Sequence, residues 1–269
     1  MRSYCPLFLF ARIFALICAA ALCVSLVSCV PKNDASENKP TEQTGDGFTG
    51  KIYFEGRRYT FEGDGDCISA EDDALVIKKE GVYLVTGRLA EGRIVTDAPC
   101  VRLVLDGAEL CSSVSSVIEA RRGALAIESE ENSLNIIRGE NNSGAQRGAI
   151  HTEGDIFLTG RGKTVVTARG LSYALVCGRL YGESGELSLT AENGIYAREA
   201  EISGGRLSIN GSKIGIYGEN RIKMIGGSLV ALCDDVALYA ENEIILTGGE
   251  RDIRAPKPYF CKKEENSKK

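Results

Sequence analysis

The sequence predicts an all-β protein folded as a right-handed, single-stranded parallel β-helix, and a five-fold repeat carries this prediction. From Ala149 to Ala255, each copy opens with a small residue, an aliphatic residue and a third, variable residue. The aliphatic residues recur at spacings of 25, 20, 21 and 22 residues, at Ile150, Leu175, Ile195, Ile216 and Leu238. A period of this length with no helical spacing is typical of a β-solenoid. Because stacked coils place equivalent residues over one another, we expect these five side chains to form one inward row.

Each repeat also contains two further short runs that predict strands. One is an apolar run closed by glycine, as in Ile244-Ile245-Leu246-Thr247-Gly248, and the other alternates apolar and polar residues, as in Leu207-Ser208-Ile209. We therefore expect one strand per run, with glycine at corners where the backbone adopts unusual torsion angles.

The chain before residue 149 fits looser coils of the same fold. Strands are expected over 74–77, 81–89, 93–97, 101–110, 124–127 and 134–137. We assign 50–255 to one β-helix domain and 256–269 to a charged C-terminal tail that frays.

The first 28 residues have the composition of a secretory signal. Arg2 and Arg12 precede or flank an apolar core, and no acidic residue is present. The segment ends in Leu26-Val27-Ser28-Cys29, which resembles the lipobox of bacterial lipoprotein precursors. The resemblance implies cleavage before Cys29, lipid attachment to its sulfur, and a membrane-anchored protein at the cell surface. The alternative is an ordinary signal followed by a chance cysteine.

Residues 29–49 are mostly polar and have little apolar surface to bury, so we expect them to form a disordered tether. The signal holds two basic residues and no acidic one, so its removal changes the formal net charge from −5 to −7. An acidic exported domain without a recognisable motif is a poor candidate for nucleic-acid binding. We expect a monomer.

Six cysteines follow Cys29, at 67, 100, 111, 177, 233 and 261. In an exported protein they are able to pair, but Cys177 aligns with Ala197, Gly218 and Ala240, which indicates a small inward position. Cys233 aligns with Gly211. The pattern favours buried, unpaired cysteines. With one histidine and no Cys-x-x-Cys motif, the sequence does not indicate a zinc site.

The order of the elements resembles that of a family of bacterial carbohydrate-binding β-helix proteins, typified by a clostridial cellulose- and pectin-binding surface protein. The resemblance spans Gly63 to Ala255 and is carried by the segments 81–87, 92–95 and 103–107 and by the downstream coils. It implies a parallel β-helix like that of pectate lyases, polysaccharide binding of a cellulose- or pectin-like glycan, and bound calcium. The acidic turns that supply calcium ligands in the family are mostly replaced here, and Asp234 and Asp235 alone keep the acidic pair. One weak calcium ion at that turn is therefore an expectation, with solvated corner residues as the alternative.

Catalysis is not predicted. The acidic residues fall on scattered turns, and we find no register that places two of them on one outward strand face beside a basic residue. No Ser/His/Asp triad is recognisable, since His151 is the sole histidine. A degenerate polysaccharide lyase stays as an alternative to a non-catalytic binding protein.

The predicted binding residues are Tyr196, Tyr217 and Tyr239, which follow the inward aliphatic residue in three consecutive coils. Alternation along a strand sends them outward, where they would form a ladder with flat faces for sugar rings and free hydroxyls. Tyr173, Tyr181 and Arg198 are expected at the rim. The alternative is an aromatic stack that packs on itself in a structural or adhesive solenoid whose ligand is a protein.

Overall fold

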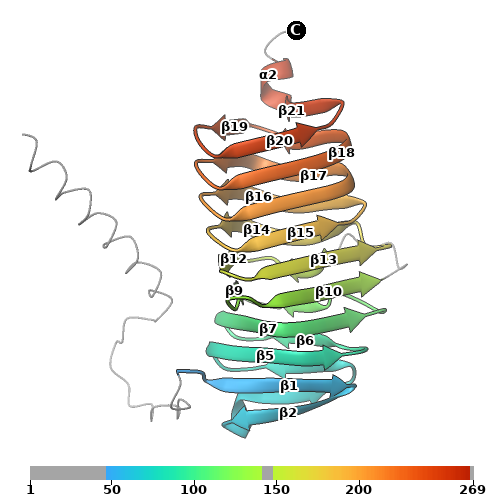
Figure 1. Ribbon diagram of the computed structural model, residues 1–269, viewed down its shortest axis with the longest axis vertical. Helices are drawn as coiled ribbons and strands as arrows, with labels where there is room; N and C mark the ends of the chain where they lie inside the picture. Colours follow the sequence, from blue (N-terminus) through green and yellow to red (C-terminus); the bar gives the residue numbers. More distant parts are fainter. Residues whose placement is uncertain (1–46, 141–147, 267–269) are drawn as a thin grey trace, which may run out of the picture. The chain divides into compact units, whose positions relative to one another are not determined.

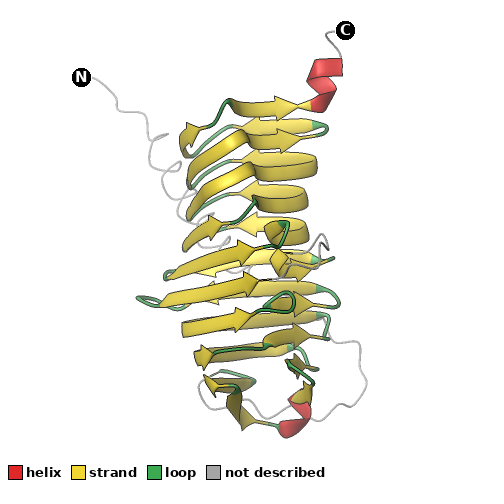
Figure 2. Ribbon diagram, turned by 90° about the vertical axis from the view of Figure 1, so that its right-hand side faces the viewer, coloured by secondary structure: helices red, strands yellow, loops and turns green. Residues whose placement is uncertain are grey.

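The computed structural model describes residues 47–140 and 148–266, and nearly every described element is a strand. The strands wind into a parallel β-helix and lie above one another as rungs of one column (Figures 1 and 2). The predicted fold is confirmed. Three sheets, called faces 1, 2 and 3 below, form the sides of the column.

Face 1 begins near the N-terminal end and runs to the last strand of the chain. Its strands, in rung order, are β4 (Ala74–Ile77), β6 (Arg93–Thr96), β8 (Ile118–Ala120), β11 (Gly148–Thr152), the first half of β14 (Tyr173–Gly182), the first half of β16 (Asn193–Ile202), the middle of β17 (Arg206–Met224), the end of β18 (Ser228–Ala240) and β21 (Lys257–Cys261).

Face 2 continues the same long strands around a corner. Its strands are β1 (Gly50–Gly56), β5 (Gly81–Leu89), the first half of β7 (Cys100–Ser112), β9 (Ala124–Ser129), β12 (Asp155–Gly160), the ends of β14, β16 and β17, and β19 (Glu243–Leu246).

Face 3 closes the triangle. Its strands are the end of β7, β10 (Leu134–Glu140), β13 (Lys163–Arg169), β15 (Glu186–Thr190), the starts of β17 and β18, and β20 (Glu250–Arg254).

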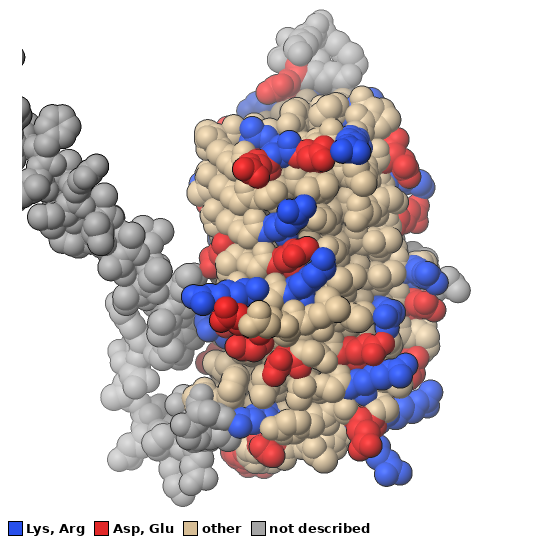
Figure 3. Space-filling view, in the orientation of Figure 1, with Lys and Arg blue, Asp and Glu red and all other residues tan. Residues whose placement is uncertain are grey.

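On the side of the molecule shown in Figure 3, acidic and basic side chains are interspersed and neither sign gathers into one patch.

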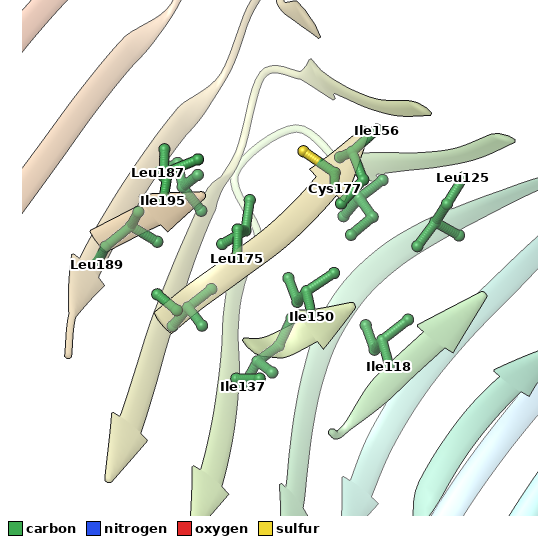
Figure 4. Packing of buried hydrophobic residues seen from close by; sticks show 14 of the residues in the cluster. Ile118, Leu125, Ile137, Ile150, Ile156, Leu175, Cys177, Leu187, Leu189 and Ile195 are labelled. Carbon is green, nitrogen blue, oxygen red and sulfur yellow. The ribbon is translucent and has the colours of Figure 1, made fainter. Parts of the chain in front are cut away.

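The interior is filled by columns of aliphatic side chains, one per rung. Ile150, Leu175, Ile195, Ile216 and Leu238 pair in direct register and are each at most 1% exposed. Figure 4 shows Ile118, Ile150, Leu175 and Ile195 following one another along this column. The predicted inward row is confirmed, and it buries apolar surface that no single coil could bury alone.

Glycines permit the tight corner between faces 2 and 3. A Cβ atom on Gly204, Gly226 or Gly248 would lie 2.1–2.2 Å from a backbone carbonyl oxygen of the rung below. No other residue type fits such an approach.

The N-terminal end is closed by antiparallel pairs that the sequence did not predict. Strand β2 (Arg58–Gly63) returns along β1, the 3₁₀ turn η2 (Gly65–Cys67) follows, and β3 (Ile68–Glu71) pairs antiparallel with β4. The expected tether ends earlier than Thr49. The Thr49 side chain is buried and accepts a hydrogen bond from the main-chain N–H of Val82 at 3.1 Å, so this residue belongs to the domain.

The C-terminal boundary was also predicted too early. Residues 257–261 form strand β21, which pairs with β18, and a short helix α2 (Lys262–Asn266) follows. The expected charged tail from Pro256 onward is therefore wrong for these residues, because Tyr259 and Phe260 continue the columns of Leu238 and Tyr239.

The predicted signal (1–28), the lipidation site Cys29 and most of the tether lie outside the described residues. Within 47–140 and 148–266, no helix has the length and apolar character needed to span a membrane.

Candidate functional site

Four aromatic rings lie in one outward row on face 1. Tyr196 pairs with Tyr217, Tyr217 with Tyr239, and Tyr239 with Phe260. The ring centroids are 5.3, 4.9 and 5.0 Å apart, and the planes of neighbouring rings differ by 7°, 10° and 22°. The common outward register predicted for the three tyrosines is confirmed. Phe260 was missed because residues from 256 were assigned to the tail, although Tyr259-Phe260 repeats the inward–outward order of Leu238-Tyr239.

We call Tyr196, Tyr217, Tyr239 and Phe260 the aromatic row, and their rings cover one another. Each ring inside the row has a parallel neighbour on both sides, so its faces are packed and its edge points outward. The hydroxyl of Tyr196 donates a hydrogen bond to Oε2 of Glu219 at 3.2 Å, and that of Tyr217 donates to Oε1 of Glu241 at 2.8 Å. The expectation of free ring faces is therefore wrong for Tyr217 and Tyr239. The expectation of free hydroxyls is wrong for Tyr196 and Tyr217.

Burial and these hydrogen bonds change the acidity of the hydroxyls. Burial is the first cause of the raised pKa of Tyr217, and the hydrogen bond to Glu241 adds to it. Burial also raises the pKa of Tyr196, followed by the charge of Glu219 and the hydrogen bond to it. Both hydroxyls are therefore protonated at neutral pH and act as fixed donors.

The aromatic row stops at Tyr196 on its N-terminal side. The next residue in the register is Val176, and the one after it is His151. Among the described residues, no ring stacks in parallel on this side of Tyr196; Tyr173 meets it at an angle of 63°, with centroids 5.6 Å apart.

A cleft of about 230 Å³ opens at this place. Its lining includes Val176 and the side chains of His151, Glu153, Tyr173, Tyr196, Arg198 and Glu219. Tyr173 and Arg198, which were expected at the rim, both line this cleft. Tyr181 was placed wrongly: it follows the corner at Gly178 and lies on face 2, where it stacks on Phe157 with centroids 4.8 Å apart.

The polar groups of the cleft are only partly engaged with one another. Nη2 of Arg198 donates to the main-chain oxygen of Glu153 at 3.5 Å, and Nε2 of His151 lies 3.6 Å from Oε1 of Glu153. The buried Nδ1 of His151 has no hydrogen-bond partner among the described residues. A recess with aromatic walls and convergent polar groups is the usual form of a small-molecule binding site.

Residues 71–269 match the model of a family described as carbohydrate-binding domain-containing protein. The chain belongs to this carbohydrate-binding domain family. No curated protein matches it. Among solved structures, a polysaccharide lyase-like protein from C. thermocellum is similar, with 20% identity, a TM-score of 0.66, and coverage of 79% of this chain and 96% of that one. At this identity the similarity supports the fold alone.

In this member of the carbohydrate-binding domain family, face 2 carries ion pairs between successive rungs. Asp155 pairs with Arg179 at 2.6 Å, Glu199 with Arg221 at 3.2 Å, and Glu201 with Lys223 at 3.1 Å. The expectation that no register places two acidic residues on one outward strand face beside a basic residue is therefore wrong, because Glu199 and Glu201 of β16 lie beside Arg221 and Lys223. Each of these carboxylates accepts a hydrogen bond from its basic partner. Acidic side chains of one rung are thus neutralised by basic side chains of the next. Because each pair is partly exposed to solvent, it contributes little to stability.

The proposed calcium turn does not present a ligand set. Asp234 and Asp235 are exposed, and Oδ1 of Asp235 lies 3.7 Å from Nζ of Lys257. In the described part of the chain, no group of three or more His, Cys, Asp or Glu side chains is placed to hold a metal ion. Calcium takes six to eight oxygen ligands, so two exposed carboxylates, one of them beside Lys257, do not form such a site by themselves.

Cys67, Cys111, Cys177, Cys233 and Cys261 form no disulfide, as the sequence pattern favoured. Cys177 is buried in the same column as Ala197, Gly218 and Ala240, and burial raises the pKa of its thiol. Cys233 pairs with Ser212 and not with the predicted Gly211, because the register shifts at this corner. Burial raises the pKa of Cys233 to about 11. Both thiols are protonated at neutral pH and serve as small core residues.

Proposed function

We propose that the protein binds a polysaccharide on face 1, along the aromatic row of Tyr196, Tyr217, Tyr239 and Phe260 and the cleft at its N-terminal end, without cleaving it. Membership of the carbohydrate-binding domain family supports this function. The observation that carries the location is the continuity of the row with the cleft, since Tyr196 belongs to both.

A linear polymer matches a linear row. The row presents a ring at each rung, and at the rungs of Tyr196 and Tyr217 polar groups lie at the adjoining corner. Glu219 and Glu241 lie there beside Asn220 and Asn242, whose side chains hydrogen-bond to each other at 2.9 Å. Carboxylates and amides at fixed positions are suited to sugar hydroxyls, because they accept and donate in defined directions.

The charges favour a neutral glycan over an acidic one. The chain after the predicted signal carries a formal net charge of −7, and the carboxylates of Glu219 and Glu241 adjoin the row. A polyuronate such as pectate would need cations to bridge like charges, and the described residues present no calcium ligand set. We therefore place a cellulose-like glucan ahead of a pectin-like polymer.

Non-catalytic binding is favoured by the state of the carboxylates on face 2. The acidic residues Asp155, Glu199 and Glu201 each face a basic partner within 3.2 Å. Glycoside hydrolysis requires a free carboxylate pair facing the sugar. The three carboxylates named here are paired, and on face 1 Glu219 accepts a hydrogen bond from Tyr196.

The lipid anchor is part of the proposal. The lipobox-like segment ending at Cys29 and the polar stretch after it support an exported protein held at the cell surface by lipid.

A structural role for the row is the second candidate. Its specific support is that the rings cover one another's faces, as expected of a stack that stiffens the sheet or presents a surface to a protein.

Pull-down of the purified protein on insoluble cellulose, pectin and peptidoglycan tests the proposal. We expect retention on cellulose in preference to pectin, with no release of reducing or unsaturated sugars. Retention on none of these glycans would favour the structural role, and sugar release would favour a lyase or hydrolase.

A further inference from the structure

The outward register of face 1 has a gap of one ring. Val76, Val95 and Glu119 come first in this register. From His151 to the C-terminal end, the residues are His151, Val176, Tyr196, Tyr217, Tyr239 and Phe260. Five of the six carry a planar ring, and Val176 alone does not.

The gap has the dimensions of one rung of the stack. Neighbouring strands lie roughly 4.8 Å apart, so His151 and Tyr196, two rungs apart, are separated by roughly 9.6 Å along the column. Within the aromatic row, one ring occupies each rung at 4.9–5.3 Å. The short side chain of Val176 therefore leaves room where a ring would otherwise stand, and this is where the cleft opens.

The gap exposes an aromatic ring face that no parallel ring of the described residues covers, in contrast to the inner rings of the aromatic row. Tyr196 is covered by Tyr217 on one face, while the other side of its ring lines the cleft and meets the ring of Tyr173 only at an angle of 63°. Inside the row, both faces of Tyr217 and Tyr239 are covered by parallel neighbours. The cleft is therefore a place on this row where a flat ring from outside can stack on an aromatic face. At the other end of the row, Nζ of Lys257 lies 5.8 Å from the ring centroid of Phe260.

Polar groups surround the same space. The buried Nδ1 of His151 has no partner within the described residues, and the guanidinium of Arg198 has its contact at the backbone of Glu153. An unpaired buried polar atom is costly unless a ligand or water satisfies it. Two carboxylates, Glu153 and Glu219, oppose the single positive charge of Arg198, so the cleft favours an uncharged ligand rich in hydroxyls over a uronate.

We propose that this cleft is the primary sugar subsite: one neutral sugar ring enters at Val176 in place of the missing aromatic rung. The ring stacks on Tyr196, with His151 on its other side and Arg198, Glu153 and Glu219 contacting its hydroxyls. The aromatic row beyond Tyr196 then serves as an extended secondary surface for the rest of the chain. This inference rests on the proposed polysaccharide-binding function.

The substitution Val176→Tyr tests it by completing the stack. An outward tyrosine in register with Tyr196 extends an existing row and fills the cleft, so we expect thermal stability equal to or above that of the wild type. Soluble glucose oligosaccharides should then bind with a Kd raised by about tenfold or more, because a stacking contact and its polar partners are lost together. Val165→Tyr is the matched control, since Val165 is an outward strand residue on face 3 between Ile136 and Ser188, and it should bind as the wild type does.

A second readout uses the fact that His151 is the single histidine of the chain. Its imidazole gives one NMR signal, which should shift on titration with the oligosaccharide in the wild type and stay fixed in Val176→Tyr. The two proposals fail differently. Wild-type affinity in Val176→Tyr, or binding by calorimetry with an unmoved His151 signal, overturns the cleft subsite and leaves binding on the aromatic row intact. Absence of glycan binding by the wild type overturns both.

Discussion

The hydroxyl of Tyr217 donates a hydrogen bond to the carboxylate of Glu241, which lies one rung further along, at 2.8 Å. This contact ties two successive coils together at the corner beside the aromatic row. It also links their ionisation: burial first, and then this bond, raises the pKa of Tyr217, and the same bond, followed by one from Lys262, lowers that of Glu241.

Stability should fall at alkaline pH partly through Tyr217. Its pKa is raised in the folded protein above the ordinary value of 10.0, so the folded state binds this proton more tightly than the unfolded chain. Its contribution is complete below pH 10.0 and is lost as the pH rises above it. We expect Tyr217→Phe, which keeps the ring and lacks the ionising group, to lose less stability than the wild type over this range. Thermal unfolding at several pH values measures the difference; parallel pH profiles would contradict it.

Truncation of the aromatic row should weaken glycan binding and spare the fold. Tyr196→Ala should weaken binding several-fold, since an aromatic contact is worth about 1 kcal/mol beyond its buried area. The triple variant Tyr196→Ala, Tyr217→Ala and Tyr239→Ala should abolish it. The matched control is Phe157→Ala with Tyr181→Ala, which removes the stacked pair on face 2. Affinity gel electrophoresis measures binding and circular dichroism the fold. Equal losses in both sets would mean that the rings of face 1 act only through stability.

The glycine corner should be intolerant of a methyl group. In Gly226→Ala, the new Cβ would lie 2.2 Å from the carbonyl oxygen of Ser203, so the rungs must move apart. We expect a loss of about 3 kcal/mol or more in the free energy of unfolding. Gly182→Ala is the control, because its nearest neighbours would be 3.9 Å away, in ordinary contact. Denaturant titration compares the two, and a Gly226→Ala protein as stable as Gly182→Ala would refute the close approach.

Lipidation should depend on Cys29. We expect Cys29→Ala to lose labelling by a radioactive fatty acid and to leave the membrane fraction or accumulate as precursor, because the thioether forms on this sulfur. Cys261→Ala, which changes another cysteine of the mature chain, should be labelled normally. Continued labelling of Cys29→Ala would exclude this anchor.

Removal of divalent cations should leave glycan binding unchanged. The expectation follows from the exposed Asp234 and Asp235, one of which faces Lys257, and from the absence of a larger ligand cluster in the described part of the chain. Binding assays with and without a chelator measure this. Loss in chelator, restored by calcium in the wild type but not in Asp234→Asn with Asp235→Asn, would establish the ion that the family resemblance implies.

Much of the fold was predictable because one repeat length sets every register at once. Once Ile150, Leu175, Ile195, Ile216 and Leu238 are aligned, the outward position of each following residue is determined, and the aromatic row follows. The same alignment holds the signal for the cleft, since His151, Val176 and Tyr196 occupy equivalent positions.

The errors arise where the backbone departs from the repeat. Strand β14 continues through the corner at Gly178 without a break in its apolar pattern, so the sequence does not separate Tyr173 on face 1 from Tyr181 on face 2. The antiparallel strands β2 and β3 close the end of the column and have no equivalent in other coils. The stacking of the tyrosine rings on one another depends on side-chain orientation. The repeat in the sequence predicts the position of each residue on a strand and does not predict that orientation.

The chain enters the β-helix at Thr49, whereas the aromatic row occupies the rungs from β16 to β21. Tyr217 stands six rungs beyond β4 on face 1, which corresponds to roughly 29 Å of column. The number of coils in the β-helix therefore sets the distance along the column between its N-terminal end and the aromatic row. Gain or loss of one coil before β16 would move the aromatic row by one strand spacing along the column and leave its residues unchanged. The distance of the row from the N-terminal end of the domain and its ligand specificity can therefore change independently.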